Sequence, residues 1–274
     1  MSGFDVVIPI FNAAAALRRC LDSLHVHLPE TAAVILVDDA STDPAVADLI
    51  DGFAAHCPVP CRVLRQPCNR GFVSSANLGM QASTRDVVLL NSDTVVTHGW
   101  LERLAACLAS DPRIATATPW SNNAEICSLP EFCRANPEPD DPERLARAAV
   151  DAGPPCYPEL PTAVGFCMAI RRAALAKLGD FDEATFGRGY GEENDFCMRA
   201  AGHGWRNVLC DDAYVVHQGG ASFAATGDRP GGAAMDRVLA RYPDYNDRVS
   251  AFIAEDPLRP HRERVLARLV ADTP

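Results

Sequence analysis

The chain gathers three carboxylates, those of Glu192, Glu193 and Asp195, within four consecutive positions of the segment GYGEENDFCMR. Three glycines, at positions 187, 189 and 191, precede these carboxylates or lie directly beside them, and a stretch with helical spacing follows. A helix N-terminus favours negative charge, whereas a neighbouring carboxylate raises proton affinity. A carboxylate tuned in this way can act as a general base toward a hydroxyl group. The alternative is a helix with an acidic first turn that ends at Gly202, preceded by a plain surface turn.

Further polar side chains follow two apolar runs that are typical of buried strands. Asp38 and Asp39 follow AVILV, and Asn91 and Asp93 follow DVVLL. One aspartate can accept a hydrogen bond from a pyrimidine base or a ribose hydroxyl, and an aspartate at a second strand end can hold Mg²⁺ or Mn²⁺ on a diphosphate. Alternatively, the segment DDASTD simply caps a helix.

A histidine closes another apolar run, at His217 in VVHQGG. A lone histidine in such a place is more often structural than functional. It becomes a candidate metal ligand if the fold brings it close to Asp93.

These residues need a scaffold that brings strand ends together. Apolar runs and helical spacing alternate along the first part of the chain, which predicts a parallel sheet covered by helices, with ligands at the carboxyl ends of its strands. A loop rich in proline and acidic residues begins near residue 130 and contains one short helix, followed by a strand, a helix and a turn, and then by one or two strands in NVLCDDAYVVHQGGASF. The predicted strands are 4–10, 33–42 (AVILVDDAST, ending in polar residues), 61–66 and 86–93 (DVVLLNSD). The predicted helices are 13–28, 44–55, 73–83, 99–110 and 142–152, with two or three more after residue 228, broken at Pro243 and Pro257.

Composition narrows the function classes. The 274 residues carry a formal net charge of −11, which argues against nucleic acid as a partner. No apolar run is long enough to span a membrane, and no basic signal-like segment opens the chain, so we expect a cytoplasmic protein. The eleven cysteines are scattered and predict reduced thiols, and the group at Cys57, Cys61 and Cys68 lacks zinc-site spacing. Neither G-x-G-x-x-G nor a P-loop motif is present.

Several segments together carry a family resemblance. They are VVIPIFN, LVDDASTD, NRGFVSSANLGMQAS, VVLLNSDTVV, GFCMAIRR, GDFDE, GYGEENDFCMRAAGHGW and VVHQGGASF, and they cover roughly residues 4–224. In this order they resemble inverting, family-2 type glycosyltransferases with the GT-A fold, an α/β fold with a mostly parallel, Rossmann-like sheet. The later segments and the tail are most similar to bacterial transferases that build surface polysaccharides, often rhamnosyltransferases.

The resemblance implies a role for each matching residue. It assigns proton abstraction to Glu193, with Glu192 as the alternative. It assigns a Mg²⁺ or Mn²⁺ site to Asp93 and His217, although Asn91 stands where the D-x-D metal motif usually has its first carboxylate. It assigns contacts with the nucleotide to Pro9, Phe11, Asp39, Asn69, Arg70 and Ser92, with Asp39 reading a uracil or thymine base.

Three residues are candidates for the acceptor side, each with a structural alternative. Trp120 could stack on a sugar or lie in the core. Asp182, in GDFDE, could bind acceptor hydroxyls or shape a turn. Asp195 could bind the acceptor or hold the loop in place.

The sequence therefore predicts metal-assisted single displacement of a sugar from a UDP- or dTDP-sugar onto a glycan or lipid-linked saccharide. We expect one domain over residues 1–227, with a nucleotide-sugar half (1–98) and an acceptor half (99–227), and a helical extension over 228–274. The basic residues near 259–268 could rest on anionic lipid at the inner face of the membrane, or form a solvated helix face. A sugar nucleotidyltransferase, which would need a G-x-x-x-R-L loop, and a non-catalytic nucleotide-sugar-binding module are the alternatives.

Overall fold

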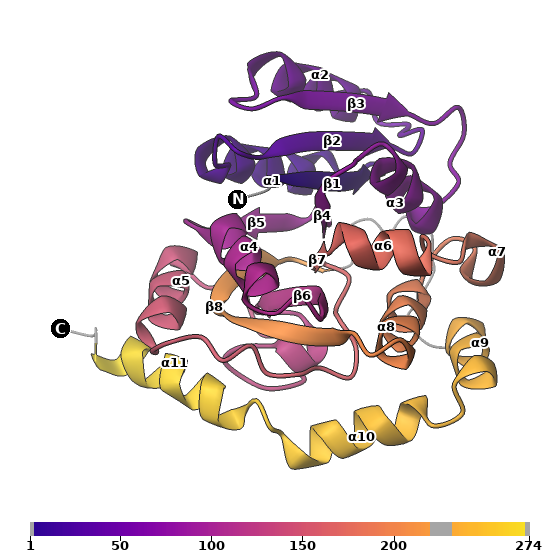
Figure 1. The fold of residues 1–274 in the computed structure, drawn as a ribbon. Coiled ribbons are helices and arrows are strands. Elements are labelled where there is room, and N and C mark those ends of the chain that lie inside the picture. The colour runs from indigo at the N-terminus through magenta and orange to yellow at the C-terminus, as the bar shows by residue number, and fades with distance from the viewer. Residues whose placement is uncertain (1–2, 220–231, 272–274) are drawn as a thin grey trace.

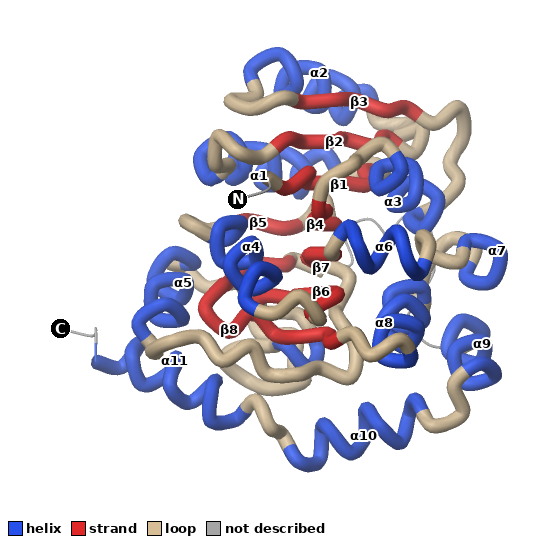
Figure 2. The backbone as a smooth tube through the Cα atoms, in the orientation of Figure 1, coloured by secondary structure: helices blue, strands red, loops and turns tan. Residues whose placement is uncertain are grey.

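The computed structural model describes residues 3–219 and 232–271. Eight strands form one sheet in the order β3-β2-β1-β4-β7-β6-β8-β5, which runs through the centre of the molecule with helices around it (Figures 1 and 2). The strands are β1 (Phe4–Ile10), β2 (Ala33–Asp38), β3 (Cys61–Arg65), β4 (Asp86–Leu90), β5 (Thr94–Val96), β6 (Ile114–Trp120), β7 (Cys167–Ile170) and β8 (Arg206–His217). The helices are α1 (Ala14–His27), α2 (Pro44–His56), α3 (Phe72–Gln81), α4 (Trp100–Ser110), α5 (Pro142–Asp151), α6 (Arg172–Leu178), α7 (Glu183–Phe186), α8 (Glu192–Gly202), α9 (Ala233–Arg241), α10 (Tyr245–Glu255) and α11 (Arg259–Ala271), with a short 3-10 helix η1 at Glu125–Cys127.

Both faces of the sheet are buried, which explains the uninterrupted apolar character of β1, β2 and β4. In β1, Val6 and Ile8 belong to one core and Val7 to the other, because successive side chains of a strand point to opposite faces. Helices α1, α2, α4 and α5 contribute to the first core, and α3, α6 and α8 to the second. The alternation thus fixes which helices cover each face.

The sheet is parallel in its first half and mixed as a whole. Strands β1 to β4 pair in parallel, as the sequence predicted, and so do β6 and β8. Strand β7 runs antiparallel to β4 and β6, and β5 runs antiparallel to β8. The strict strand–helix alternation is broken after β4, where β5 follows with no helix between them.

The three C-terminal helices run as a band along one side of the molecule (yellow in Figure 1). Helix α9 ends before Pro243 and helix α10 before Pro257, as predicted. Leu258 and Val265 join the first core. The predicted boundary at residues 227 and 228 lies outside the described residues, as do the last residues of VVHQGGASF. Among the described helices, none combines the length and the apolar character needed to cross a bilayer.

The basic residues of the tail mostly contact the protein itself. Arg262 is buried and, with Arg259, pairs with Asp256, and Arg264 lies beside Asp211. Arg268 is exposed. The prediction that these basic residues face lipid or solvent is therefore wrong for Arg262, which is buried and pairs with Asp256. All eleven cysteines are free thiols; six are buried, two are half-buried, and three, Cys68, Cys133 and Cys156, are exposed.

Candidate active site at the carboxyl edge of the sheet

Asp93 and His217 meet because β5 pairs with β8. Thr94 lies opposite His217 in that ladder, and the Asp93 carbonyl accepts the N–H of Gln218. The His217 Nε2 is 3.5 Å from the Asp93 Oδ1, and both residues are largely buried. Two ligands about 2.1 Å from a shared cation lie roughly 3.0–3.5 Å apart when they are neighbours. The spacing therefore fits a pair of ligands to one divalent ion.

The fold points the Nε2 atom of His217 toward Asp93, because Nδ1 contacts a backbone carbonyl. The Nδ1 of the ring is 2.7 Å from the backbone carbonyl oxygen of Asn123, which can only accept, so Nδ1 carries the proton. The side chain of Asn122 accepts the His217 N–H and donates to the His217 carbonyl. Such outer hydrogen bonds fix the tautomer and orientation of a metal-binding histidine.

Phe166 links this pair to helix α8. Its ring stacks on His217 with centroids 5.1 Å apart, and its carbonyl accepts the N–H of Asn91. The preceding residue, Gly165, faces the Glu193 side chain, since a Cβ built on Gly165 would lie 3.9 Å from the Glu193 carboxyl carbon. One short segment thus touches both the Asp93–His217 pair and the candidate base.

The two glutamates that open α8 form a closely coupled pair. Burial and the neighbouring Glu193 raise the pKa of Glu192 well above its usual range, and burial also raises the pKa of Glu193. Backbone N–H groups at the helix start and the side chain of Glu192 counteract that rise in Glu193. The Oε2 atoms of both residues are closed to solvent and have no hydrogen-bond partner among the described residues. The pKa of Glu192 is thus raised further than that of Glu193, so Glu193 is the more easily ionised of the two.

Asp39 anchors the loop that precedes α3. Its Oδ1 accepts from the Gln66 amide and the Arg70 N–H, and its Oδ2 accepts from the Gly71 N–H at 2.7 Å. Burial raises the pKa of Asp39, and the hydrogen bonds from Arg70 and Gly71 oppose that rise. A carboxylate has about four acceptor positions, so one on Oδ2 is left for a further donor.

The same loop is held against the glycine-rich segment before α8. Asn69 accepts from Arg188, Arg70 pairs with Glu183 at 2.8 Å, and the Arg188 carbonyl accepts the N–H of Phe72. Gly71 has φ +94°, and a Cβ there would lie 2.7 Å from the Arg188 Cα. Only glycine permits this close approach. The loop that holds Asn69 and Arg70 therefore packs against the segment that leads into α8.

The remaining nucleotide-side candidates line the same carboxyl edge. Pro9 is buried opposite Val37 in the sheet, and Phe11 is half-buried after β1. Ser92 is buried between β4 and β5, next to Asp93. In the DDASTD segment, Asp43 caps α2 by accepting the Ala45 N–H, so the capping alternative holds for that residue.

Asp195 holds the structure in place. It is fully buried, and its carboxylate accepts from Arg199, Arg241 and Tyr242 at 2.6–2.8 Å. Of the two predicted roles, acceptor binding is wrong for this arrangement, because both carboxylate oxygens are enclosed and paired. Holding the loop is the role that these contacts support.

Asp182 and Trp120 also have structural roles. Asp182 caps α7 by accepting the N–H and hydroxyl of Thr185, and it pairs with Arg241. Trp120 is fully buried, and its indole N–H donates to the Asp211 carbonyl. A sugar cannot stack on an enclosed ring, so the core alternative is the correct one for Trp120.

Sequence reasoning missed the residues that support the site. Asn122, Asn123 and Phe166 orient His217, yet nothing in their type or spacing marks them. Arg188 and Arg241 are ordinary basic residues in the sequence, and their partners lie far away along the chain. A signal for Gly71 was present in NRGF, where a glycine follows the polar residues of a predicted loop.

Solved structures share this architecture. GalNAc-T7 with UDP, GalNAc and Mn²⁺ superimposes with a TM-score of 0.66 at 15% identity, over 98% of this chain and 54% of that one. The mannosyltransferase PcManGT from Pyrobaculum calidifontis, with GDP-Man and Mn²⁺, gives 0.58 at 18% identity over 100% and 76%. These likenesses establish the GT-A fold, with its sheet mixed rather than mostly parallel.

The relatives that the sequence matches are also named as glycosyltransferases. The pre-mycofactocin glycosyltransferase of Mycobacterium tuberculosis is 33% identical over 218 residues, which are 77% of this chain and 42% of that protein. Human polypeptide N-acetylgalactosaminyltransferase 6 is 32% identical over 120 residues, or 41% of this chain and 19% of the relative. The match therefore spans less than half the length of either relative. Residues 5–179, more than half of the 274-residue chain, match the model of glycosyl transferase family 2, and the chain belongs to that family.

Proposed function

We propose that the chain transfers a sugar, with inversion, from a UDP- or dTDP-sugar to a hydroxyl of a glycan or lipid-linked saccharide. The observation that carries this proposal is the contact series from Asp93 and His217 through Phe166 and Gly165 to Glu193. It joins a divalent-metal ligand pair to a buried carboxylate whose Oε2 atom has no hydrogen-bond partner among the described residues. Family membership supports a nucleotide-sugar donor.

Asp93 and His217 would hold the divalent ion, Mg²⁺ or Mn²⁺. The donor set fits, because a carboxylate oxygen and a tautomer-fixed imidazole nitrogen lie 3.5 Å apart. A bound ion would offset the negative charge that develops on the departing nucleoside diphosphate. With Asn91 in place of a second carboxylate, the protein would contribute few charged ligands to such an ion.

Glu193 performs the proton transfer in this proposal. Its ionised carboxylate accepts the proton of the acceptor hydroxyl while that oxygen bonds to the anomeric carbon and the bond from that carbon to the diphosphate breaks. Glu192, kept protonated by burial, donates to Glu193 and holds its carboxylate in place. No bond between the enzyme and the sugar forms in this single displacement.

The nucleotide occupies the edge formed by the ends of β1, β2 and β4. The free acceptor position on Asp39 receives the imide N–H of uracil or thymine, with Pro9 and Phe11 beside the base. Asn69, Arg70 and Ser92 lie toward the ribose and the diphosphate. Residues 1–98 then act as the donor half and residues 99–227 as the acceptor half. The proposal of rhamnose transfer in surface-polysaccharide synthesis rests on the resemblance of the later segments to bacterial rhamnosyltransferases.

The named neighbours differ in donor, which makes the nucleotide worth testing. GalNAc-T7 was solved with UDP, TarS of S. aureus with UDP-GlcNAc, and PcManGT with GDP-Man. The test is release of nucleoside diphosphate from a panel of UDP-, dTDP- and GDP-sugars, with Mn²⁺ and a simple saccharide acceptor. We expect release from UDP- or dTDP-sugars only, and a β-linked product from an α-linked donor. Turnover of GDP-sugars alone, or retained anomeric configuration, would contradict the proposal.

A further inference from the structure

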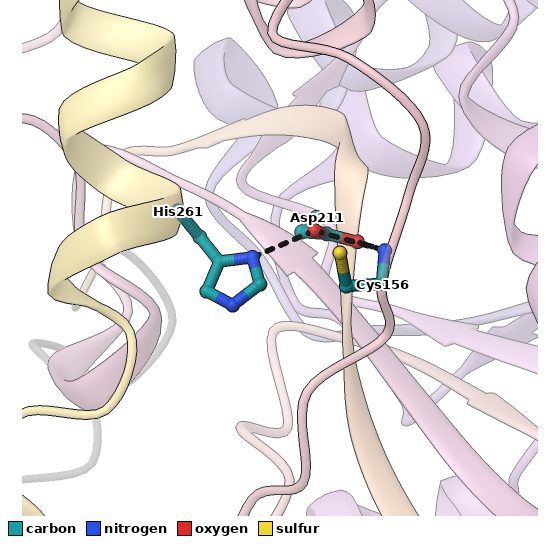
Figure 3. A group of neighbouring side chains, drawn as sticks. All are labelled: Cys156, Asp211 and His261. Carbon is teal, nitrogen blue, oxygen red and sulfur yellow. Dashed lines mark hydrogen bonds and ion pairs between the residues drawn. The ribbon is translucent and has the colours of Figure 1, made fainter.

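A second cluster of metal-ligating side chains lies where α11 meets β8. The Cys156 thiol, the Asp211 carboxylate and the His261 imidazole each offer a ligand atom, and these atoms lie within 4.8 Å of one another (Figure 3). The residues come from the loop after α5, from β8 and from the first turn of α11. None of them belongs to the proposed transferase site.

The Asp211 carboxylate is fixed before any ligand binds. Its side chain is 4% exposed, and it accepts the backbone N–H groups of Cys156 and Tyr157 at 3.1–3.2 Å. Strand β8 bulges here, because Pro119 pairs with Cys210 whereas the next residue, Trp120, pairs with Tyr214. A bulge re-aims side chains out of the ladder, and hydrogen bonds to a carboxylate orient it as a metal ligand.

The hydrogen bonds of His261 conflict with one another. Its Nδ1 is 3.0 Å from an Asp211 oxygen and 3.0 Å from an Arg264 guanidinium nitrogen. If Nδ1 carries a proton, it can donate to Asp211, but it then faces the N–H donors of Arg264. If Nδ1 carries a lone pair, it can accept from Arg264, but it then faces the carboxylate. One contact is unsatisfied in either tautomer.

A cationic group already lies against all three ligand atoms. The same Arg264 nitrogen is 3.0 Å from the His261 Nδ1, 3.7 Å from the Asp211 oxygen and 3.8 Å from the Cys156 sulfur. The Arg264 side chain is 42% exposed, so it can move into solvent. A smaller, doubly charged cation in its place would satisfy the imidazole lone pair and the carboxylate together.

We propose that Cys156, Asp211 and His261 bind a divalent transition metal of the zinc class. A thiolate, an imidazole nitrogen and a carboxylate oxygen are ligands that Zn²⁺ accepts in tetrahedral sites, with water in the fourth position. Binding releases the thiol proton, moves the imidazole proton to Nε2 and displaces the Arg264 guanidinium. Because the ligands belong to three separate segments, the metal fastens the C-terminal helix to the body of the protein.

Cobalt provides the direct test, since a Co²⁺–thiolate bond gives a charge-transfer absorption band that carboxylate and imidazole ligands alone do not give. The full chain, freed of metal with a chelator, is titrated with Co²⁺ and then with Zn²⁺. We expect one thiolate-bound Co²⁺ per chain, displacement by Zn²⁺, and a higher melting temperature with Zn²⁺. Arg264→Ala should bind Co²⁺ several-fold more tightly, because the competing cation is gone.

The controls separate this site from other thiols and from the donor site. Cys156→Ser replaces an exposed side chain, so it should fold, and it should lose both the band and the Zn²⁺-dependent rise in melting temperature; His261→Ala should do the same. Cys68→Ser, another exposed cysteine, and Asp93→Asn should retain the band. Absence of the band in the unaltered chain, or its persistence in Cys156→Ser, would overturn the proposal.

Discussion

Among single residues, the glutamate pair at the start of α8 makes the sharpest prediction. Glu193→Gln should lower turnover by about 10²–10⁴-fold, because it removes the base, while UDP affinity stays unchanged. Glu192→Gln should keep most of the activity, because its amide can donate to Glu193 as the protonated acid does. Diphosphate release and UDP binding measured on both variants check this, and equal losses in the two would refute the assignment.

The raised pKa of Glu193 sets the pH dependence of activity. The base works only when ionised, so activity falls as the pH drops through its pKa. Because burial raises that pKa, the acidic limb of kcat/KM should lie above the pH of about 4.3 expected for an ordinary glutamate. A pH–rate profile whose acidic limb lies at or below that value would contradict the account of a buried base.

Glu192 makes a separate prediction about stability. Its folded pKa is raised, so its contribution to stability is complete below the unfolded pKa, about pH 4.3, and is lost as the pH rises through the folded pKa. Glu192→Gln should therefore be more stable than the unaltered chain at pH 8, with a smaller difference near pH 4.5. Urea unfolding at the two pH values measures this, and a difference independent of pH would count against a buried neutral Glu192.

The Asp93–His217 pair predicts metal-dependent nucleotide binding. His217→Ala and Asp93→Asn should each weaken UDP binding in the presence of Mn²⁺ by about 10-fold or more, because each removes a ligand from a small set. Without metal, the variants and the unaltered chain should bind alike. His25→Ala, at an exposed position of α1, is the control and should leave affinity unchanged. Undiminished binding in His217→Ala would exclude it as a ligand.

Residue types and spacing indicated candidate residues better than the residues that support them. Asp93 and His217 could be proposed as partners because each follows an apolar run and both match the metal-binding positions implied by the family resemblance. Asp195 could not be assigned, because its buried state depends on Arg241, 46 residues further along the chain. The same distance hid the environment of Trp120, which looks identical in sequence whether it lies in the core or faces a sugar.

Helix α9 positions α8 through one arginine. Arg241 donates to Asp195 in the first turn of α8 and to Asp182 at the start of α7, and Val238 of α9 packs where a Cβ on Gly191 would lie. The C-terminal helices therefore support the loop and helix that carry Glu193.

Arg241→Met should loosen this support. It removes hydrogen bonds to charged groups, which contribute about 1.5–3 kcal/mol to the free energy of unfolding. We expect a loss near the lower end of this range, because the Arg241 side chain is 38% exposed. The melting temperature should fall by a few degrees. We expect kcat to fall more than UDP affinity, since the base moves while the nucleotide edge stays intact. Arg248→Met, which removes an exposed pair with Asp244, is the matched control. Unchanged kcat in Arg241→Met would contradict a positioning role.

Elements were predictable where local signals were strong. Helices α1, α2, α3, α4 and α5 lie within a few residues of their expected bounds, because their apolar spacing is regular. Strands β5 and β6 were not predicted: β5 has three residues, and β6, IATATPW, alternates small and hydroxyl side chains without an apolar run. Their burial follows from β8, which pairs with both.

For the whole molecule, Leu258 and Val265 of the C-terminal part join the main core, whereas Val238 of α9 and Tyr245 of α10 pack in a separate cluster with Phe186 and Met198. Leu258 is fully buried in the main core, whereas Ile253 of α10 is 41% exposed. Leu258→Ala should cost about 2–5 kcal/mol of unfolding free energy, and Ile253→Ala less than about 0.5 kcal/mol. Denaturant unfolding measures both, and a small loss in Leu258→Ala would mean that the tail packs independently of the body.

The global arrangement follows from sequence only in part. The parallel half of the sheet is dictated by strand–helix alternation, so its carboxyl edge and the residues there could be anticipated. The antiparallel placement of β5 and β7 depends on contacts between distant segments, which periodicity does not encode. The closeness of Asp93 to His217 arises from that unpredicted pairing.

Calorimetric binding of UDP, dTDP, GDP and ADP, each with Mn²⁺ and with a chelator, tests the donor site itself. We expect that UDP or dTDP binds, that Mn²⁺ strengthens the binding, and that Asp93→Asn removes the effect of the metal. No nucleotide binding by a folded sample, or binding indifferent to Mn²⁺ and to Asp93, would contradict a donor site at this edge of the sheet.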